Sequence, residues 1–182
     1  KVDYFDPNLV SRTTNQVRAK ENAIVTYEQK ADALAQQIEA MRQELSLKRE
    51  QLSAKVKQVE LKIASQEAEL EQAEVALSIA QRQFDRTDTL FQQGIKSRTD
   101  WEDKRQKLQE SQAKAVAAGN KLLESQQGLA VAQLDLRNVV NEYTNKIAKA
   151  QSDRFSTLSD RFGAEGDLNK MQIQAENYEK RQ

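Results

Sequence analysis

The sequence predicts an all-α fold, a long antiparallel coiled-coil hairpin made of two helices. Three observations lead to this prediction. Ala, Glu, Lys, Leu, Gln and Arg dominate the 182 residues, with 31% charged and 38% hydrophobic side chains, 5 Gly and a single Pro. Neither Gly nor Pro occurs from Asn8 to Gln93. Apolar residues recur at steps of three and four on both sides of one interruption at Gly94, which is the period of a coiled-coil seam.

The composition argues against several function classes. The 28 basic and 28 acidic side chains are mixed along the chain, whereas a nucleic-acid surface or a polybasic membrane patch would cluster positive charge. No apolar run approaches the roughly 20 residues that a transmembrane helix needs. We therefore expect no nucleic-acid partner and no direct membrane contact for this chain. Since it begins with Lys1 rather than Met, we interpret it as part of a larger protein.

The sequence contains no pattern typical of an enzyme. Histidine and cysteine, which supply the commonest general base and many metal ligands, are both absent. There is also no nucleophile elbow, no phosphate-binding loop and no dinucleotide-binding glycine pattern. We therefore predict no catalytic residues, no metal site and no cofactor.

The first predicted helix spans residues 7–93. Asp6 can cap its start, and Pro7 suits the first helical position because the N–H that proline lacks would be unpaired there. Between Leu45 and Leu52 the apolar spacing fits only with one additional four-residue step, so we predict a stutter near 45–52, where this arm divides into two helices or continues as one. The predicted seam residues are Ile24, Tyr27, Ala31, Leu34, Ile38, Met41, Leu45, Leu52, Val56, Val59, Ile63, Leu70, Ala73, Leu77, Ala80 and Phe84.

The second predicted helix spans residues 98–182. Gly119 and Gly128 lie inside it, where glycine facing a partner helix would let the two backbones approach closely. Two further glycines lie close together near 163–167, so we expect a break or kink there. The seam of this arm repeats every seven residues, at Trp101, Leu108, Ala115, Leu122, Leu129, Leu136, Tyr143 and Ala150.

The two seams meet if the chain folds back near position 96. Apolar residues then face each other over most of the length of both arms, which two unrelated helices would not be expected to achieve. This agreement is the main reason for predicting one hairpin. The predicted facing pairs are Phe84 with Leu108, Leu77 with Ala115, Leu70 with Leu122, Ile63 with Leu129, and Val56 with Leu136.

A tip turn over residues 94–97 is predicted to join the two arms. Gly94 suits the left-handed position that ends many helices. Ser97, with Asp100 three residues later, has the form of a cap for the next helix. A capped turn alone is a sufficient structural explanation for Gly94 and Ser97.

Arg86 and Leu90 suggest a further role for this turn, because residues four apart share one face of a helix close to the tip. Here the sequence resembles the membrane fusion proteins, or periplasmic adaptors, of the HlyD type. Their helical hairpins carry an Arg-x3-Leu-x6-Ser pattern at the tip, which Arg86, Leu90 and Ser97 match, together with Gly94. The segment 1–6 also resembles the junction at which such hairpins leave a lipoyl domain, whose first half is missing here.

The resemblance implies a role in a tripartite export system of a Gram-negative bacterium, with type I secretion favoured. The parent protein would be anchored in the inner membrane beside a pump, an ABC transporter rather than a proton-driven one. In the periplasm its hairpins would assemble as a homo-oligomer, typically a hexamer, and their tips would meet a TolC-like outer-membrane channel. Arg86, Leu90 and Ser97 would contact that channel.

Other interpretations of the same residues stay open at this stage. Phe91, Gly94 and Ile95 would add to the tip contact, or Phe91 and Ile95 would instead pack against Trp101. The whole chain could be a structural coiled-coil rod or tether with no channel partner. A lipid-binding amphipathic helix is disfavoured, because such helices have wider apolar faces than these stripes.

Overall fold

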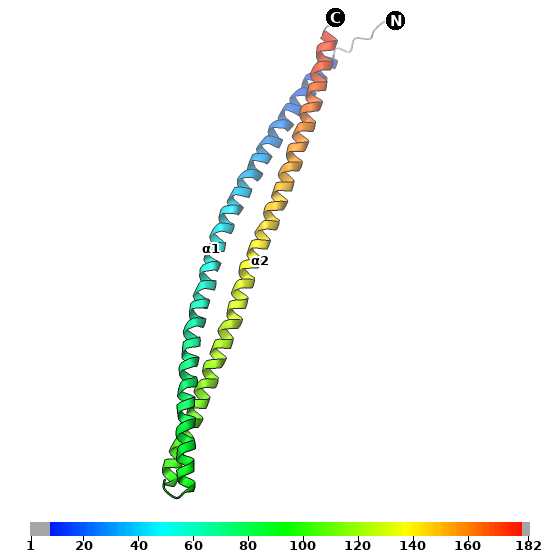
Figure 1. The fold of residues 1–182 in the computed structure, drawn as a ribbon. Coiled ribbons are helices and arrows are strands. Elements are labelled where there is room, and N and C mark those ends of the chain that lie inside the picture. Colours follow the sequence, from blue (N-terminus) through cyan, green and yellow to red (C-terminus); the bar gives the residue numbers. More distant parts are fainter. Residues whose placement is uncertain (1–7, 180–182) are drawn as a thin grey trace. The chain divides into compact units, whose positions relative to one another are not determined.

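The computed structural model describes residues 8–179, and these are all-helical apart from the segments that flank the helices. Helix α1 spans Leu9–Gln92 and helix α2 spans Arg98–Glu179, and no strand occurs in this part of the chain. The two helices pack against each other, and Figure 1 shows the reversal between them in green. The predicted junction at residues 1–6, and Pro7 with it, lie outside the described residues.

Helix α1 begins two residues later than Pro7, the start predicted from the sequence. Its first turn is closed by the amide of Arg12, which donates a 2.9 Å hydrogen bond to the carbonyl oxygen of Asn8. Asn8 therefore stands at the cap position, and asparagine is among the residues most favoured there.

Helix α2 is continuous across 163–167, where a break or kink was expected, so no break occurs there. An isolated glycine costs a helix only about 1 kcal/mol relative to alanine, which the packing of a long helix offsets. Ala164, between the two glycines, is buried, with 7% of its surface exposed. Arg161 pairs with Glu165 across the same turn. Helix α1 is likewise continuous across 45–52.

The contacts divide the chain into two units. One comprises residues 48–139, which include the turn, and the other combines the residues up to Leu47 with those from Val140 onward. The boundary on α1 lies close to the predicted stutter. Half-buried residues follow alternating steps of three and four, except for two consecutive four-residue steps from Lys48 to Leu52 and from Leu52 to Val56.

In the unit of residues 48–139, the helices meet along a narrow seam of small side chains. The buried residues of α1 in this unit are separated by multiples of seven, so they occupy one line along the helix. Only Leu108 among the buried residues is a large apolar one. Two helices alone enclose a thin core, which explains why small and hydroxyl-bearing residues are common in it. The buried residues are Gln66, Ala80, Thr87, Leu108, Ser111, Ser125 and Ala132.

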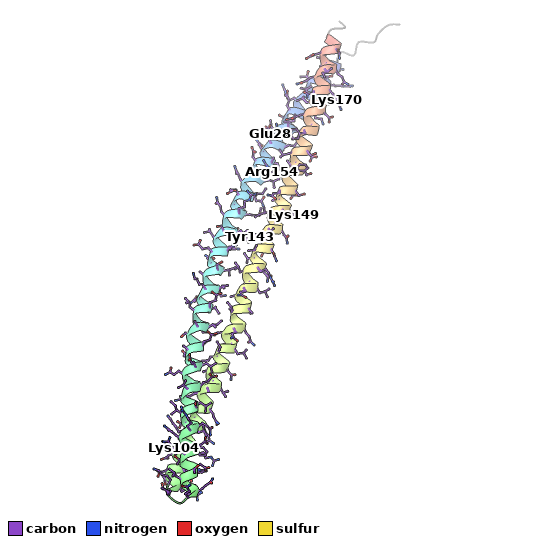
Figure 2. The ribbon with its side chains drawn as sticks, viewed as in Figure 1. Glu28, Lys104, Tyr143, Lys149, Arg154 and Lys170 are labelled. Atoms are coloured by element: carbon purple, nitrogen blue, oxygen red, sulfur yellow. The ribbon has the colours of Figure 1, made fainter. Side chains whose placement is uncertain are left out.

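The other unit has a similar seam, which ion pairs flank. Lys20 pairs with Asp167 at 3.1 Å, and Arg161 pairs with Glu28 at 3.0 Å, so both pairs join α1 to α2. Figure 2 labels Glu28 on α1 in this unit. The buried residues are Ala31, Ile38, Tyr143, Ala150, Thr157 and Ala164.

The register of the two helices differs from the predicted one by about one helical turn. Leu77 was expected to face Ala115, but its neighbour Ala76 lines the same groove as Ser111. The Nζ of Lys104, labelled in Figure 2, likewise donates to Oε1 of Gln83 at 3.5 Å. The reversal is thus centred near Gly94 rather than near position 96, and a shift of the centre by two residues displaces every facing pair by four.

Gly119 and Gly128 do not mark a close approach of the two backbones. A Cβ atom added at either position would meet no atom within 4 Å among the described residues. The expectation that these glycines bring the helices together is therefore wrong, and each could carry a side chain without a clash.

Candidate functional site

The turn between the helices is closed by backbone hydrogen bonds on the side of α1. The amide of Ile95 donates to the carbonyl of Leu90 at 2.9 Å, and the amide of Gly94 donates to the carbonyl of Phe91 at 3.0 Å. This pair of bonds is the Schellman motif, which requires a left-handed residue just beyond the helix. Gly94 supplies this residue with a φ of +75°. It is the one described residue whose φ is positive. The predicted helix stop is thus present at Gly94.

Ser97 starts the second helix as predicted. Its Oγ accepts a 3.1 Å hydrogen bond from the amide of Asp100, and its carbonyl oxygen accepts one from the amide of Trp101 at 3.2 Å. The first bond satisfies an amide of the first helical turn that would otherwise lack a partner, and the second is the first regular backbone bond of the helix. Ser97 is exposed, so its hydroxyl group caps α2 while it remains at the surface.

An aromatic cluster fixes the two helices together beside the turn. The ring of Trp101 stacks on Phe91 at a centroid distance of 5.7 Å and lies tilted against Phe84 at 5.9 Å. Its Nε1 donates a 2.8 Å hydrogen bond to Oδ1 of Asp88 on α1. The guanidinium carbon of Arg105 lies 5.4 Å from the Trp101 ring centroid, within the range of a cation–π contact. The turn therefore has a core of its own.

Arg86 takes no part in this cluster. The residue is exposed, and its guanidinium has no ion pair or hydrogen bond with any residue between 8 and 179. Its neighbour Thr87 is 7% exposed and occupies the seam instead. An arginine on a helix face without a partner keeps all five of its donors available for another molecule.

Leu90 is half-buried and lies one helical turn beyond Arg86 on the same face of α1. Its carbonyl oxygen is held by the Schellman bond from Ile95, and that of Phe91 by the bond from Gly94, so the backbone that carries the Leu90 side chain is fixed. The structure thus brings Leu90 close to Gly94 and places Arg86 and Ser97 at the surface on either side of the turn.

Phe91 and Ile95, for which two interpretations were open, differ in their surroundings. Phe91 packs on Trp101, as the purely structural alternative supposed, and is half-buried. Ile95 is 66% exposed, which leaves most of its side chain available at the turn. An apolar side chain exposed at a turn is available for contact with another protein.

Sequence reasoning missed the residues that hold the turn together. Asp88 and Thr87 were not singled out, yet Asp88 accepts the Trp101 hydrogen bond and Thr87 is buried. Arg105 was also not singled out. The sequence feature that could have revealed these residues is Trp101, the only tryptophan. A tryptophan next to a tight turn needs a hydrogen-bond acceptor for its N–H, which an acidic residue on the other helix can supply.

An open groove of about 460 Å³ lies between the helices in the same unit. Ala76 and Ile79 of α1 form its apolar wall, and Lys107 and Lys114 of α2 line its other side.

No group of three or more acidic residues in the described part of the chain is placed to hold a metal ion. Between residues 8 and 179, neither helix has a stretch apolar enough to cross a membrane.

Comparisons with models of known protein families, with curated proteins and with solved structures gave no match for this chain.

Proposed function

We propose that this chain is the helical hairpin of a periplasmic adaptor protein, and that its turn docks end-on to a TolC-like outer-membrane channel. The two helices form an antiparallel coiled coil that carries the turn away from the rest of the adaptor. The adaptor is anchored in the inner membrane of a Gram-negative bacterium, beside a pump of a type I secretion system, an ABC transporter rather than a proton-driven pump. Its hairpins assemble as a homo-oligomer, with six copies the expected number.

The unpaired guanidinium of Arg86 carries this proposal. Elsewhere on the hairpin, several exposed arginines have partners on their own helix, such as Arg98 with Glu102 at 3.0 Å and Arg42 with Glu39 at 3.7 Å. Arg86 has none among the described residues, as is also true of Arg18, Arg49 and Arg137, but of these four it alone lies within two turns of the end of α1. A planar fork of donors at this place suits carboxylates, or the free carbonyl groups at the end of a helix in a partner.

The rigidity of the turn supports the same role. Binding through a loop that is already ordered avoids the entropic cost of fixing it on association. Here the Schellman bonds, the Ser97 cap and the Trp101 cluster each restrain the turn before any partner arrives. Leu90 and Ile95 then supply the apolar contact next to the Arg86 charge.

The test is export by the full-length adaptor carrying either Arg86→Glu or Leu90→Asp. We expect export to fall at least tenfold with each change, because one reverses the docking charge and the other places a charge in the apolar contact. Matched controls on the same helix are Arg18→Glu and Leu47→Asp, since both residues are exposed and lie in the other unit. The thermal midpoint of the Arg86→Glu hairpin should stay unchanged, which separates lost docking from lost folding.

A structural rod or tether without a channel partner is the second candidate, and it predicts a different outcome. In a rod the turn only reverses the chain, so Arg86→Glu and Leu90→Asp would leave activity of the parent protein intact. Survival of export with both changes would therefore reject docking through the turn and favour the rod.

A further inference from the structure

Two rows of unpaired charge run along the unit of residues 48–139, one on each helix. Glu60, Glu67 and Glu74 lie seven residues apart on α1, and Lys107, Lys114 and Lys121 lie seven apart on α2. All six residues are exposed, and none forms an ion pair or hydrogen bond with any residue in the described range 8–179. Residues seven apart share a helix face, so each row follows one line along its helix, with Glu110 lying beside the lysine line between Lys107 and Lys114.

The two rows lie on opposite flanks of the packed helices. Lys107 and Lys114 line the groove together with Ala76 and Ile79 of α1, which places the lysine row on the groove side. Glu74 precedes Ala76 by two residues, or about 200° around the helix, and therefore lies on the far side of α1. The lysines therefore lie on the other side from the glutamate row of the same chain, and Glu69, which lines the groove with Lys107 and Lys114, forms no ion pair with a described residue.

The two rows nevertheless lie at matching positions along the helix axes, which are called heights below. Lys114 lines the groove with Ala73, the residue immediately before Glu74, so Lys114 and Glu74 are nearly level. One heptad farther from the turn, Lys121 is level with Glu67 by the same register. A second chain placed alongside without any axial shift would therefore bring its glutamates level with the lysines of the first.

The residues between and beside these charges also fit such a neighbour. Ala117 lies between Lys114 and Lys121, at about the height of Glu71, and its small side chain leaves room for that carboxylate. Two acidic residues bracket the pair Lys114 and Lys121: Glu110, which follows Lys107 and accepts a hydrogen bond from Gln106, and Glu124. At their heights α1 carries Ser78 and Ala64, so a neighbour would present no acidic group to them.

We propose that a second copy of this chain docks on the lysine row, with α2 of one protomer against α1 of the next at equal height. Lys114 then pairs with Glu74 of the next protomer, and Lys121 pairs with Glu67. Because different surfaces of the two copies meet, the contact is head-to-tail, and rotation about an axis parallel to the helices closes it into a ring. This pairing deepens the homo-oligomer of the proposed function and rests on it.

The first test uses disulfide formation in the full-length protein with all other cysteines removed. The present chain has none of its own. With Glu74→Cys and Lys114→Cys together, mild oxidation should give a ladder of covalent oligomers on a non-reducing gel. Either cysteine alone should give none, because in a head-to-tail contact a residue does not meet its own copy. No ladder with the pair, or equal dimer with the single variants, would overturn the proposal, as would a disulfide to a different protein instead of a second copy.

The second test uses charge reversal and its rescue. Lys114→Glu with Lys121→Glu, and separately Glu67→Lys with Glu74→Lys, should each weaken self-association at least tenfold in sedimentation experiments. Combining all four changes should restore it to within about threefold, since every pair is again of opposite sign. The matched control, Lys149→Glu with Lys170→Glu, makes the same charge change on exposed residues of α2 in the other unit. Figure 2 labels both control residues. Absence of rescue would reject the pairing.

The two proposals fail in different ways. Arg86→Glu should abolish export and leave the disulfide ladder intact, because Arg86 belongs to neither row. If the ladder forms while Arg86→Glu still exports normally, docking through the turn is wrong and the pairing stands. If Arg86→Glu behaves as expected but no ladder forms, the pairing alone is wrong.

Discussion

The indole Nε1 of Trp101 donates a 2.8 Å hydrogen bond to Oδ1 of Asp88 across the two helices. This bond ties the first turn of α2 to the last turns of α1, and Phe91 stacks on the same ring. The end of the hairpin is therefore a small ordered unit rather than a loose connection. This order favours the proposed docking, since a restrained surface loses less entropy when it binds.

Replacing Trp101 with Phe should destabilise the hairpin by about 1–3 kcal/mol, because Oδ1 of the half-buried Asp88 loses its donor while only Oδ2 keeps one, the Gln92 amide at 3.0 Å. The measurement is thermal unfolding followed by circular dichroism. The matched control is Asp85→Asn, whose carboxylate accepts only from Gln81 on the same exposed helix face. We expect that change to alter stability by less than about 0.5 kcal/mol. Equal effects of the two variants would show that the Trp101 bond contributes little.

Gly94 and Gly119 should respond to alanine in opposite directions. At Gly94 the φ of +75° is costly for any residue with a Cβ, so Gly94→Ala should destabilise by about 1–2 kcal/mol. At Gly119 a Cβ meets nothing within 4 Å in the described structure, so Gly119→Ala should stabilise by about 0.5–1 kcal/mol. Chemical denaturation of the two variants against the unmodified chain gives both values. Stabilisation by Gly94→Ala would contradict the left-handed turn.

Arg161 should matter more than other arginines in surface ion pairs. It contacts both Glu28 and Glu165, and its side chain is only 29% exposed, whereas Arg98 is 82% exposed in its pair with Glu102. We expect Arg161→Ala to cost about 1 kcal/mol at low ionic strength, partly through lost packing of its aliphatic stem. Arg98→Ala should cost less than about 0.5 kcal/mol. Both melts are to be repeated in 1 M salt, where the electrostatic part of the difference should shrink.

Gln66 should be a site at which the chain can be stabilised. Its side chain is buried in the seam, and its Oε1 has no hydrogen-bond partner within the described structure. Gln66→Leu removes that unsatisfied acceptor and should raise the free energy of unfolding by about 1–2 kcal/mol. Gln58→Leu, at an exposed position of the same helix, is the control and should have little effect on stability. A loss of stability with Gln66→Leu would indicate that the amide is paired in solution.

The sequence was sufficient to predict the helices and the turn, because the signals for them are local. Gly94 and Ser97 occupy the positions inferred for them, since a left-handed residue and a capping hydroxyl group have few alternatives next to a turn. The register was missed by one helical turn. The apolar stripes repeat every seven residues, so a four-residue displacement still places many apolar side chains in contact.

Other errors came from judging residues one at a time. The glycines near 163–167 suggested a break, but buried Ala164 and the paired Arg161 hold that turn helical. At the candidate site, the positions of Arg86 and Leu90 followed from their spacing in the sequence. The absence of any partner for Arg86 in the described chain, and the bond from Trp101 to Asp88, depend on side-chain geometry that no spacing contains.

The central claim, docking of the turn to an outer-membrane channel, is tested most directly by a photo-crosslinking residue at position 86 of the full-length adaptor. Irradiation in the presence of a TolC-like channel should give a covalent product that contains the channel, and the same residue at exposed position 18 should give none. A product of equal yield from both positions, or none from position 86 while export proceeds normally, would contradict the account.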